Sequence, residues 1–199
     1  TLTSPATGFS TNKTPQLAYS ANDGTVVVKV DGIVVGKTSG ANLDQLADGL
    51  HAVLVQATDA AGNVGSASVT FSVDTTAPAI ASSAPASGSL TNSASSITVT
   101  LGDGINGSGV DLASSLASAD VKLAGVSVPG SWAVQGATLV FTPQSLPLAD
   151  GIYAVTLHPA DMLSNAGTVA FSFTVDAIKP AVQAVAMNPA SPHKAESVI

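Results

Sequence analysis

The chain has 199 residues, of which 45% are hydrophobic and only 10% charged, so it can bury a core but needs a surface of mainly uncharged polar residues. The net charge is −7 and the six basic residues are scattered, which excludes a patch able to neutralise a row of nucleic-acid phosphates. The absence of cysteine and of any apolar run near the roughly 20 residues of a membrane helix excludes disulfides, thiolate metal sites and helical membrane insertion.

The first half of the chain shows the two-residue period of strands that bury one face. Residues 26–30 place valine at every second position and end at Asp31-Gly32, which predicts a hairpin turn. Residues 68–73 alternate serine or threonine with valine or phenylalanine. Between these strands, residues 59–63 (Asp-Ala-Ala-Gly-Asn) predict another turn, because Asp accepts backbone N–H groups there and Gly or Asn adopts positive φ.

The second half repeats the strand pattern, with one exception. Residues 139–143 and 171–175 alternate as strands do, whereas 111–119 predict a single helical turn. The weak alternation at 182–187 has two interpretations: the frayed start of a further module, or an orphan strand that pairs with the sheet edge of a neighbouring molecule.

The strongest signal is an internal repeat. Residues 48–78 align without a gap with residues 150–180, and Asp-Gly, Ala-Val, a lone Asp, a lone Asn, Phe-x-Val-Asp and a final Pro recur. We therefore predict module 1 at 1–76, module 2 at 77–178, and a linker with the first strand of a further module at 179–199. Because both ends of the chain are abrupt, we expect a piece of a longer repetitive protein.

Short strands separated by Gly, Pro, Asn and Asp predict an all-β fold of packed sheets. The pattern L-A-D-G-x-[Y/H]-A-V, then D-x-x-x-N, then F-x-V-D-x-x-x-P, resembles the closing half of bacterial immunoglobulin-like repeats. The resemblance implies two tandem immunoglobulin-like β-sandwiches with Greek-key topology and about seven strands each. Tyr153 has the form of a tyrosine corner, in which the phenol bonds to upstream backbone, but His51 stands at this place in module 1.

The residues give no indication of catalysis, and we predict that the chain is not an enzyme. His51, His158 and His193 share no metal-ligand spacing, and no nucleophile elbow or phosphate loop occurs. We expect His51 and His158 to be structural residues on a strand. Trp132 is expected to fill the core or cover a sheet face rather than to stack on a sugar.

Calcium at the module junctions is the cofactor prediction, because hard cations bind several carboxylate, amide and carbonyl oxygens. In an immunoglobulin-like sandwich, two loops lie at one end beside the chain's entry. This topology would bring Asp74 to Asp103 and Asp161, with Asn165 as a further ligand, and it puts Asp176 at the next junction. The resemblance supports the idea, since related repeat adhesins use calcium at such joints. The alternative is that these residues only cap turns and end strands.

The predicted function is structural: a stalk or spacer repeat of a large secreted or surface-displayed bacterial protein, with neighbouring immunoglobulin-like modules as partners. One alternative is a filament subunit assembled by edge-strand pairing, and another is a glycan-binding or protein-binding accessory module of a secreted enzyme. Because the linkers at 74–78 and 176–180 are short and contain proline, we expect an extended, semi-rigid pair.

Overall fold

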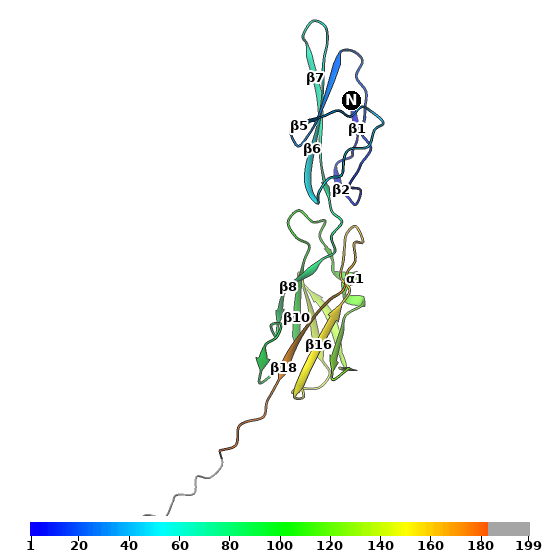
Figure 1. Ribbon diagram of the computed structural model, residues 1–199. Coiled ribbons are helices and arrows are strands. Elements are labelled where there is room, and N and C mark those ends of the chain that lie inside the picture. Colours follow the sequence, from blue (N-terminus) through cyan, green and yellow to red (C-terminus); the bar gives the residue numbers. More distant parts are fainter. Residues whose placement is uncertain (183–199) are drawn as a thin grey trace, which may run out of the picture.

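The computed structural model describes residues 1–182, which form two β units arranged end to end along one long axis (Figure 1). The strands of module 1 lie between Leu2 and Val73 and those of module 2 between Ala79 and Val175, so a short linker joins the two. The predicted all-β class, a tandem pair of immunoglobulin-like sandwiches, is confirmed. The predicted strand at 182–187, apart from Val182, and His193 lie outside the described residues.

Module 1 packs a five-stranded sheet, in the order β2-β7-β6-β4-β5, against a smaller layer that contains the β1–β3 pair. The β2–β7 pair is parallel and the other pairs of the large sheet are antiparallel. The strands are β1 (Leu2–Ser4), β2 (Gly8–Ser10), β3 (Ala18–Tyr19), β4 (Thr25–Val30), β5 (Ile33–Val35), β6 (Gly49–Thr58) and β7 (Val64–Val73).

Module 2 packs a four-stranded sheet, β14-β15-β10-β8, against a five-stranded sheet, β13-β12-β16-β18-β9, and adds the short β11–β17 pair. Here too the chain's early strand β9 runs parallel to its last strand β18. The elements are β8 (Ala79–Ala84), β9 (Leu90–Thr91), β10 (Ile97–Gly102), β11 (Val110–Asp111), α1 (Leu112–Ala117), β12 (Asp120–Leu123), β13 (Val126–Ser127), β14 (Gly130–Gln135), β15 (Thr138–Pro143), β16 (Gly151–Leu157), β17 (Ala160–Asp161) and β18 (Val169–Val175).

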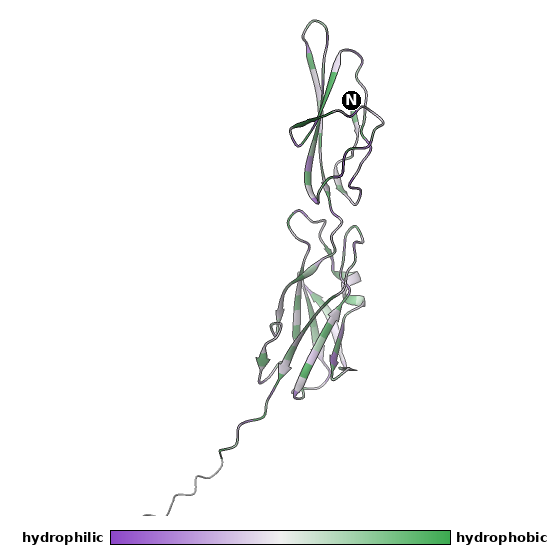
Figure 2. Cartoon of the chain, in the orientation of Figure 1, coloured by the Kyte–Doolittle hydropathy of each residue, from purple (hydrophilic) through white to green (hydrophobic). Residues whose placement is uncertain are grey.

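Each module has its own core, built mainly from alternate residues of its strands, with Leu17, Leu43 and Leu148 added from the segments between strands. Colouring by hydropathy shows the alternation of polar and apolar residues along the strands (Figure 2). The buried apolar residues of module 1 are Leu17, Val28, Leu43, Val53, Val55, Phe71 and Val73. Those of module 2 are Ile97, Val99, Leu101, Val121, Leu139, Phe141, Leu148, Tyr153, Val155, Leu157, Phe171, Phe173 and Val175. The two cores share no residue, so each module packs around a core of its own.

Several local predictions are confirmed by the structure. Asp31 and Gly32 join β4 to β5 with φ values of 51° and 82°, as a two-residue hairpin requires. The predicted helical turn is α1, whose first turn is capped by the carboxylate of Asp111. His158, in contrast, is exposed and lies one residue beyond β16, rather than on the strand that the sequence predicts.

Candidate metal centre

The linker enters module 2 between two of its loops (Figure 1). Asp74 follows β7 directly, and its backbone N–H donates to the carbonyl of Ser10 at 2.9 Å, which extends the β2–β7 pairing by one residue. One flanking loop, residues 103–109, joins β10 to β11, and the other, residues 162–168, joins β17 to β18. The strand that closes module 1 therefore delivers its terminal carboxylate to the loop end of module 2.

Asp161 organises the second loop. Its Oδ1 accepts the N–H groups of Leu163 at 2.9 Å and Asn165 at 2.7 Å, and its Oδ2 accepts the Asn165 amide Nδ2–H at 2.7 Å. The same Nδ2 group donates to the main-chain carbonyl of Asp74 at 3.0 Å. Asn165 therefore both orients Asp161 and ties module 2 to the linker.

Backbone N–H groups of the first loop hold the other two carboxylates. Ser108 N–H donates to Asp74 Oδ2 at 2.7 Å, and Gly109 N–H donates to Asp103 Oδ2 at 2.6 Å. The tight loop requires glycine at 107, because a Cβ atom there would lie 1.8 Å from the carbonyl oxygen of Asp103. A larger residue at this position would push the loop away from Asp74.

Three carboxylates converge at this joint. One oxygen from each of Asp74, Asp103 and Asp161 lies within 4.8 Å of the other two. Asp74 and Asp161 are only 3% and 2% exposed, and Asp103 is half-buried. None of the ion pairs within residues 1–182 involves these three side chains. Their negative charges therefore repel one another in a largely dry setting.

The surroundings treat the carboxylates differently. Burial raises the pKa of Asp103, and the negative charges of Asp74 and Asp161 raise it further, against the opposing hydrogen bond from Gly109. Burial also acts to raise the pKa of Asp161, but the hydrogen bonds from the side chain and backbone of Asn165 outweigh it, so the net pKa is lowered. The protein thus stabilises the charge of Asp103 less than that of Asp161.

The residues present fit a hard divalent cation. Asp103 Oδ1 is buried and has no hydrogen-bond partner of good geometry within residues 1–182, although buried polar atoms normally have one. The buried Ser108 hydroxyl also makes no well-aligned hydrogen bond there, but it lies close enough to Asp103 and Asp161 to favour their ionised forms. Ca²⁺ binds about six to eight oxygens and accepts carboxylates, hydroxyls, carbonyls and water. Three converging carboxylates and an unpaired carboxylate oxygen supply the charge and part of the donor set for such an ion.

The other two predicted ligands have different positions. Asn165 lies beside the cluster, but it uses its amide nitrogen as a hydrogen-bond donor. Asp176 lies at the opposite end of module 2, where its N–H donates to the carbonyl of Thr91 and its Oδ1 accepts the N–H of Ile178. The structure thus brings together three of the five predicted residues and holds Asn165 next to them.

Sequence reasoning missed the module 1 side of the joint. The Asp48 carboxylate accepts the hydroxyl groups of Thr75 at 3.0 Å and Thr76 at 2.6 Å, and Lys13 Nζ lies 3.1 Å from it. The hydrogen bond from the Thr76 hydroxyl is the largest of the effects that hold the pKa of Asp48 well below its usual range. Lys13 and Thr75 lower this pKa further, and the partial removal of water acts in the opposite direction. The two threonines that follow Asp74 in the sequence could have indicated a polar contact at the linker. Nothing in the sequence relates Lys13 to them, because it lies far away along the chain.

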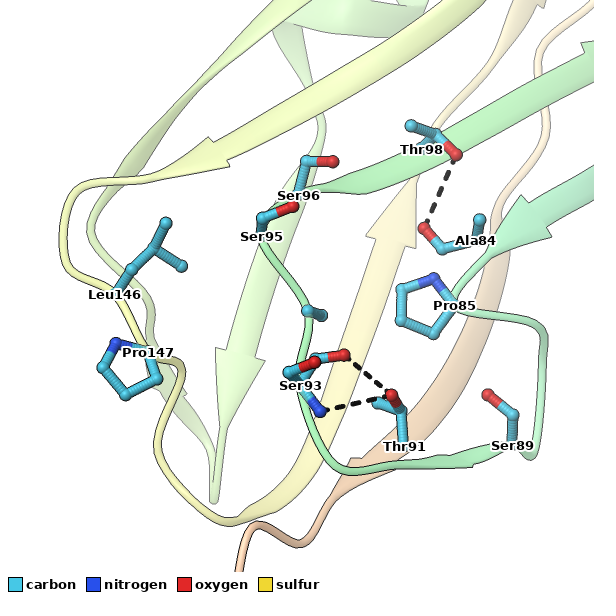
Figure 3. A pocket seen from close by; sticks show the side chains of 11 residues that line it. Ala84, Pro85, Ser89, Thr91, Ser93, Ser95, Ser96, Thr98, Leu146 and Pro147 are labelled. Atoms are coloured by element: carbon cyan, nitrogen blue, oxygen red, sulfur yellow. Dashed lines mark hydrogen bonds between the residues drawn. The ribbon is translucent and has the colours of Figure 1, made fainter.

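A second concave region lies at the far end of module 2. This hollow of about 630 Å³ is formed by the chain around β9, the start of β10 and Leu146-Pro147 (Figure 3). Serine, threonine, alanine, proline and leucine line it, and no titratable or aromatic side chain does so. The hollow therefore lacks the acid–base groups of a hydrolytic site and the stacking surface of a typical sugar site.

Two facing sheets, in which an early strand runs parallel to the last one, define each module as an immunoglobulin-like sandwich. Two sequence profiles, each described as a bacterial Ig-like domain, match residues 4–75 and residues 74–175. The second match alone covers half of the chain, so the chain belongs to the bacterial Ig-like domain family, as its repeat motifs imply. Domains of this family are generally non-catalytic.

Several solved structures are similar to parts of this chain. PcoC, a methionine-rich copper resistance protein from Escherichia coli, is 20% identical over 51% of this chain and 100% of its own, with a TM-score of 0.44. CopC from Methylosinus trichosporium OB3b is 20% identical over 50% and 93%, with a TM-score of 0.41. The fibronectin(III)-like modules of Clostridium thermocellum CbhA are 13% identical over 93% and 99%, with a TM-score of 0.34. Identities and TM-scores this low carry no argument about the fold or the function of this chain.

The comparison with curated proteins gives no match. Within residues 1–182, no helix has the length and apolar character needed to cross a membrane.

Proposed function

We propose that the chain is a structural spacer from a large secreted or surface-displayed bacterial protein of the adhesin or matrix type. The observation that carries this proposal is the joint. Residues 74–76 are hydrogen-bonded to Asp48 in module 1 and to Ser108 and Asn165 in module 2. A linker that is held from both sides keeps two modules at a fixed spacing, which is the mechanical task of a spacer. The neighbouring modules of the same chain are then its principal partners.

We further propose that this joint binds Ca²⁺ through Asp74, Asp103 and Asp161. The ion would replace the mutual repulsion of the three carboxylates with shared coordination. Asp74 belongs to the linker, whereas Asp103 and Asp161 belong to two different loops of module 2. Binding would therefore connect the linker to both loops, with Asn165 and the loop N–H groups keeping the carboxylates in place.

The observations favour a spacer over a glycan-binding accessory module. Such a module would need a concave surface with exposed aromatic side chains near Trp132. The hollow in Figure 3 has no aromatic lining, and Trp132 is half-buried with its ring centroid 5.3 Å from that of Phe141. The filament alternative requires strand pairing between chains, so sedimentation of the purified chain over a range of concentrations tests it.

Isothermal titration with Ca²⁺ and thermal unfolding with and without a chelator test the cation. At a Ca²⁺ concentration of about 100 Kd, binding to the folded state alone adds about 2.7 kcal/mol of stability, which raises the unfolding temperature by several degrees. Asp103→Asn should abolish this gain, because it removes one of the three charges but keeps an oxygen for the Gly109 N–H.

Asp176→Asn is the matched control. Asp176 occupies the repeat position of Asp74 but lies away from the three-carboxylate cluster, so this variant should keep the full response to Ca²⁺. Unchanged melting of the wild type on chelation would refute the cation proposal. The spacer proposal has a separate test, because small-angle scattering that requires a broad range of inter-module angles would refute it.

A further inference from the structure

His51 occupies the corner position of module 1 and makes the contact that a tyrosine makes in module 2. Tyr153 Oη donates to the carbonyl of Ala149 at 2.9 Å. One repeat earlier, His51 Nε2 lies 2.9 Å from the carbonyl oxygen of Ala47. Each ring also lies beside a phenylalanine of the neighbouring strand, Phe71 in module 1 and Phe173 in module 2. The histidine therefore replaces the tyrosine in position, packing and hydrogen bonding.

The histidine also has a partner that the tyrosine lacks. Its Nδ1 lies 2.8 Å from Asp31 Oδ2, in the hairpin turn between β4 and β5. Asp31 Oδ1 accepts the N–H of Ala52 at 2.8 Å, which fixes the carboxylate beside the ring. The His51 side chain is only 10% exposed. The ring thus links the β4–β5 turn to the segment that precedes β6.

The two partners impose a protonation state on the ring. A main-chain carbonyl and an ionised carboxylate are both pure hydrogen-bond acceptors. The ring satisfies both only when Nδ1 and Nε2 each carry a proton, that is, as the imidazolium ion. A neutral ring has one N–H, so it must leave either Ala47 or Asp31 facing a nitrogen lone pair.

We propose that His51, Asp31 and the Ala47 carbonyl form a proton-dependent latch, which closes the corner of module 1 when the ring is charged and loosens it when the ring is neutral. Module 2 has no such dependence, because the Tyr153 hydroxyl keeps its proton well beyond neutral pH. Burial raises the pKa of Tyr153 above its ordinary value, despite the hydrogen bond to Ala149.

Three elements pack around the His51 ring, and only one of them presents an unpaired charged group to it within residues 1–182. Asp31 is the ionisable group that faces it from the β4–β5 turn, and β7 offers the uncharged Phe71. The segment that carries Ala47 also contains Asp44 and Asp48, which are paired with Lys37 and Lys13 respectively. Asp31 is therefore the group that controls the charge of His51.

The sign of the pH effect follows from the contacts. Burial acts to lower the pKa of His51, but the hydrogen bonds to Ala47 and Asp31 and the charge of Asp31 outweigh it, so the net pKa is raised. The stability that the latch contributes is fully present below the unfolded-state pKa of about 6.5 and is lost as the pH rises through the folded-state value. The latch also requires that Asp31 is ionised. Burial acts to raise the pKa of Asp31, but the hydrogen bonds from Ala52 and His51 outweigh it, so the net pKa is lowered. The latch therefore operates from mildly acidic to near-neutral pH.

Two measurements on the whole chain test the latch. The NMR titration of the His51 ring should have its midpoint above about 6.5, the value of an unperturbed histidine. Hydrogen exchange, corrected for the intrinsic pH dependence, should show β6 losing protection as the ring deprotonates, by roughly fivefold for one lost hydrogen bond. The equivalent strand β16 in the same molecule is the internal control and should show no such loss.

Two variants make the result specific. Asp31→Asn gives a neutral ring a complete set of partners, since the new amide can donate to Nδ1 while Nε2–H donates to Ala47. This variant should lower the midpoint of the ring and keep β6 protected at high pH. His51→Tyr should give β6 the same pH-independence as β16. A ring midpoint at or below about 6.5, or an equal loss of β6 protection in the wild type and in Asp31→Asn, would overturn the latch.

Discussion

At the scale of single residues, the internal repeat allows equivalent residues of the two modules to be compared directly. The turn at Asp59 and Asn63 has the same hydrogen bonds as the turn at Asp161 and Asn165, including the amide-to-carboxylate bond, at 2.9 Å and 2.7 Å respectively. Only Asn165 also donates to a linker carbonyl, that of Asp74. The same local chemistry therefore acts as a simple turn in module 1 and as part of the inter-module joint in module 2.

The corner residue of module 2 gives a prediction at this scale. Tyr153→Phe removes the hydroxyl that donates to Ala149 but keeps the ring that stacks on Phe173 at 5.2 Å. We expect a loss of about 1 kcal/mol in the free energy of unfolding, because one part-buried hydrogen bond is removed. Urea unfolding measures this loss. Tyr19→Phe is the control, since the Tyr19 hydroxyl makes no hydrogen bond within residues 1–182, and an equal loss in both variants would contradict the assignment.

At the scale of elements, each strand contributes one face to the core. On β15, Leu139 and Phe141 are 0% and 3% exposed. Thr142, which follows Phe141 on the same strand, points the other way and is exposed. The β10 strand beside it repeats this pattern with Ile97 and Val99, both fully buried. The two-residue period of the sequence therefore arises because successive side chains point to opposite faces of the sheet and only one face is covered by the core.

Leu139→Ala tests this packing. The side chain is completely buried in the four-stranded sheet, so its truncation should leave a cavity and cost about 2–5 kcal/mol. Val126→Ala, on the 71% exposed side chain of β13, should cost far less. Chemical denaturation followed by Trp132 fluorescence reports on module 2 directly, because Trp132 is the single tryptophan of the chain. Equal effects of the two substitutions would contradict the core described here.

At the scale of the whole molecule, the two joints of the repeat differ. Asp48 binds the side chains of Thr75 and Thr76. Within residues 1–182, its repeat equivalent Asp150 accepts only the backbone N–H of Ala177, at 2.8 Å. The side-chain hydroxyls that bind Asp48 are thus absent from the corresponding positions after module 2, which are Ala177 and Ile178. The side-chain hydrogen bonds of the first joint therefore come from residues that the repeat does not preserve.

Asp48→Ala should widen the distribution of distances between the modules, because it frees the linker from module 1. The chain has no native cysteine, so spin labels at Ser66→Cys and Gln135→Cys are unique, and electron–electron distance measurements report on the joint. Asp150→Ala, at the equivalent position of module 2, should leave this distribution unchanged. A distribution that stays narrow in Asp48→Ala would show that the module 2 loops hold the linker without help from Asp48.

Much of this architecture could be predicted from the sequence because it depends on neighbouring residues. Strand alternation, the Asp31-Gly32 turn and the helical turn within 111–119 are determined by residues a few positions apart. The repeat then gave the number of modules, and the known arrangement of loops in such sandwiches suggested that Asp74, Asp103 and Asp161 lie at one end.

Other features arose only in the folded chain, because they join residues that no local pattern relates. The loop bends tightly enough at Gly107 for Ser108 to reach Asp74, which is 34 residues earlier. Lys13 meets Asp48 at the linker, and Asp31 meets His51 across 20 residues. Local sequence determines which strands and turns form, whereas the stacking of the sheets decides which distant charges and hydrogen-bond donors come into contact.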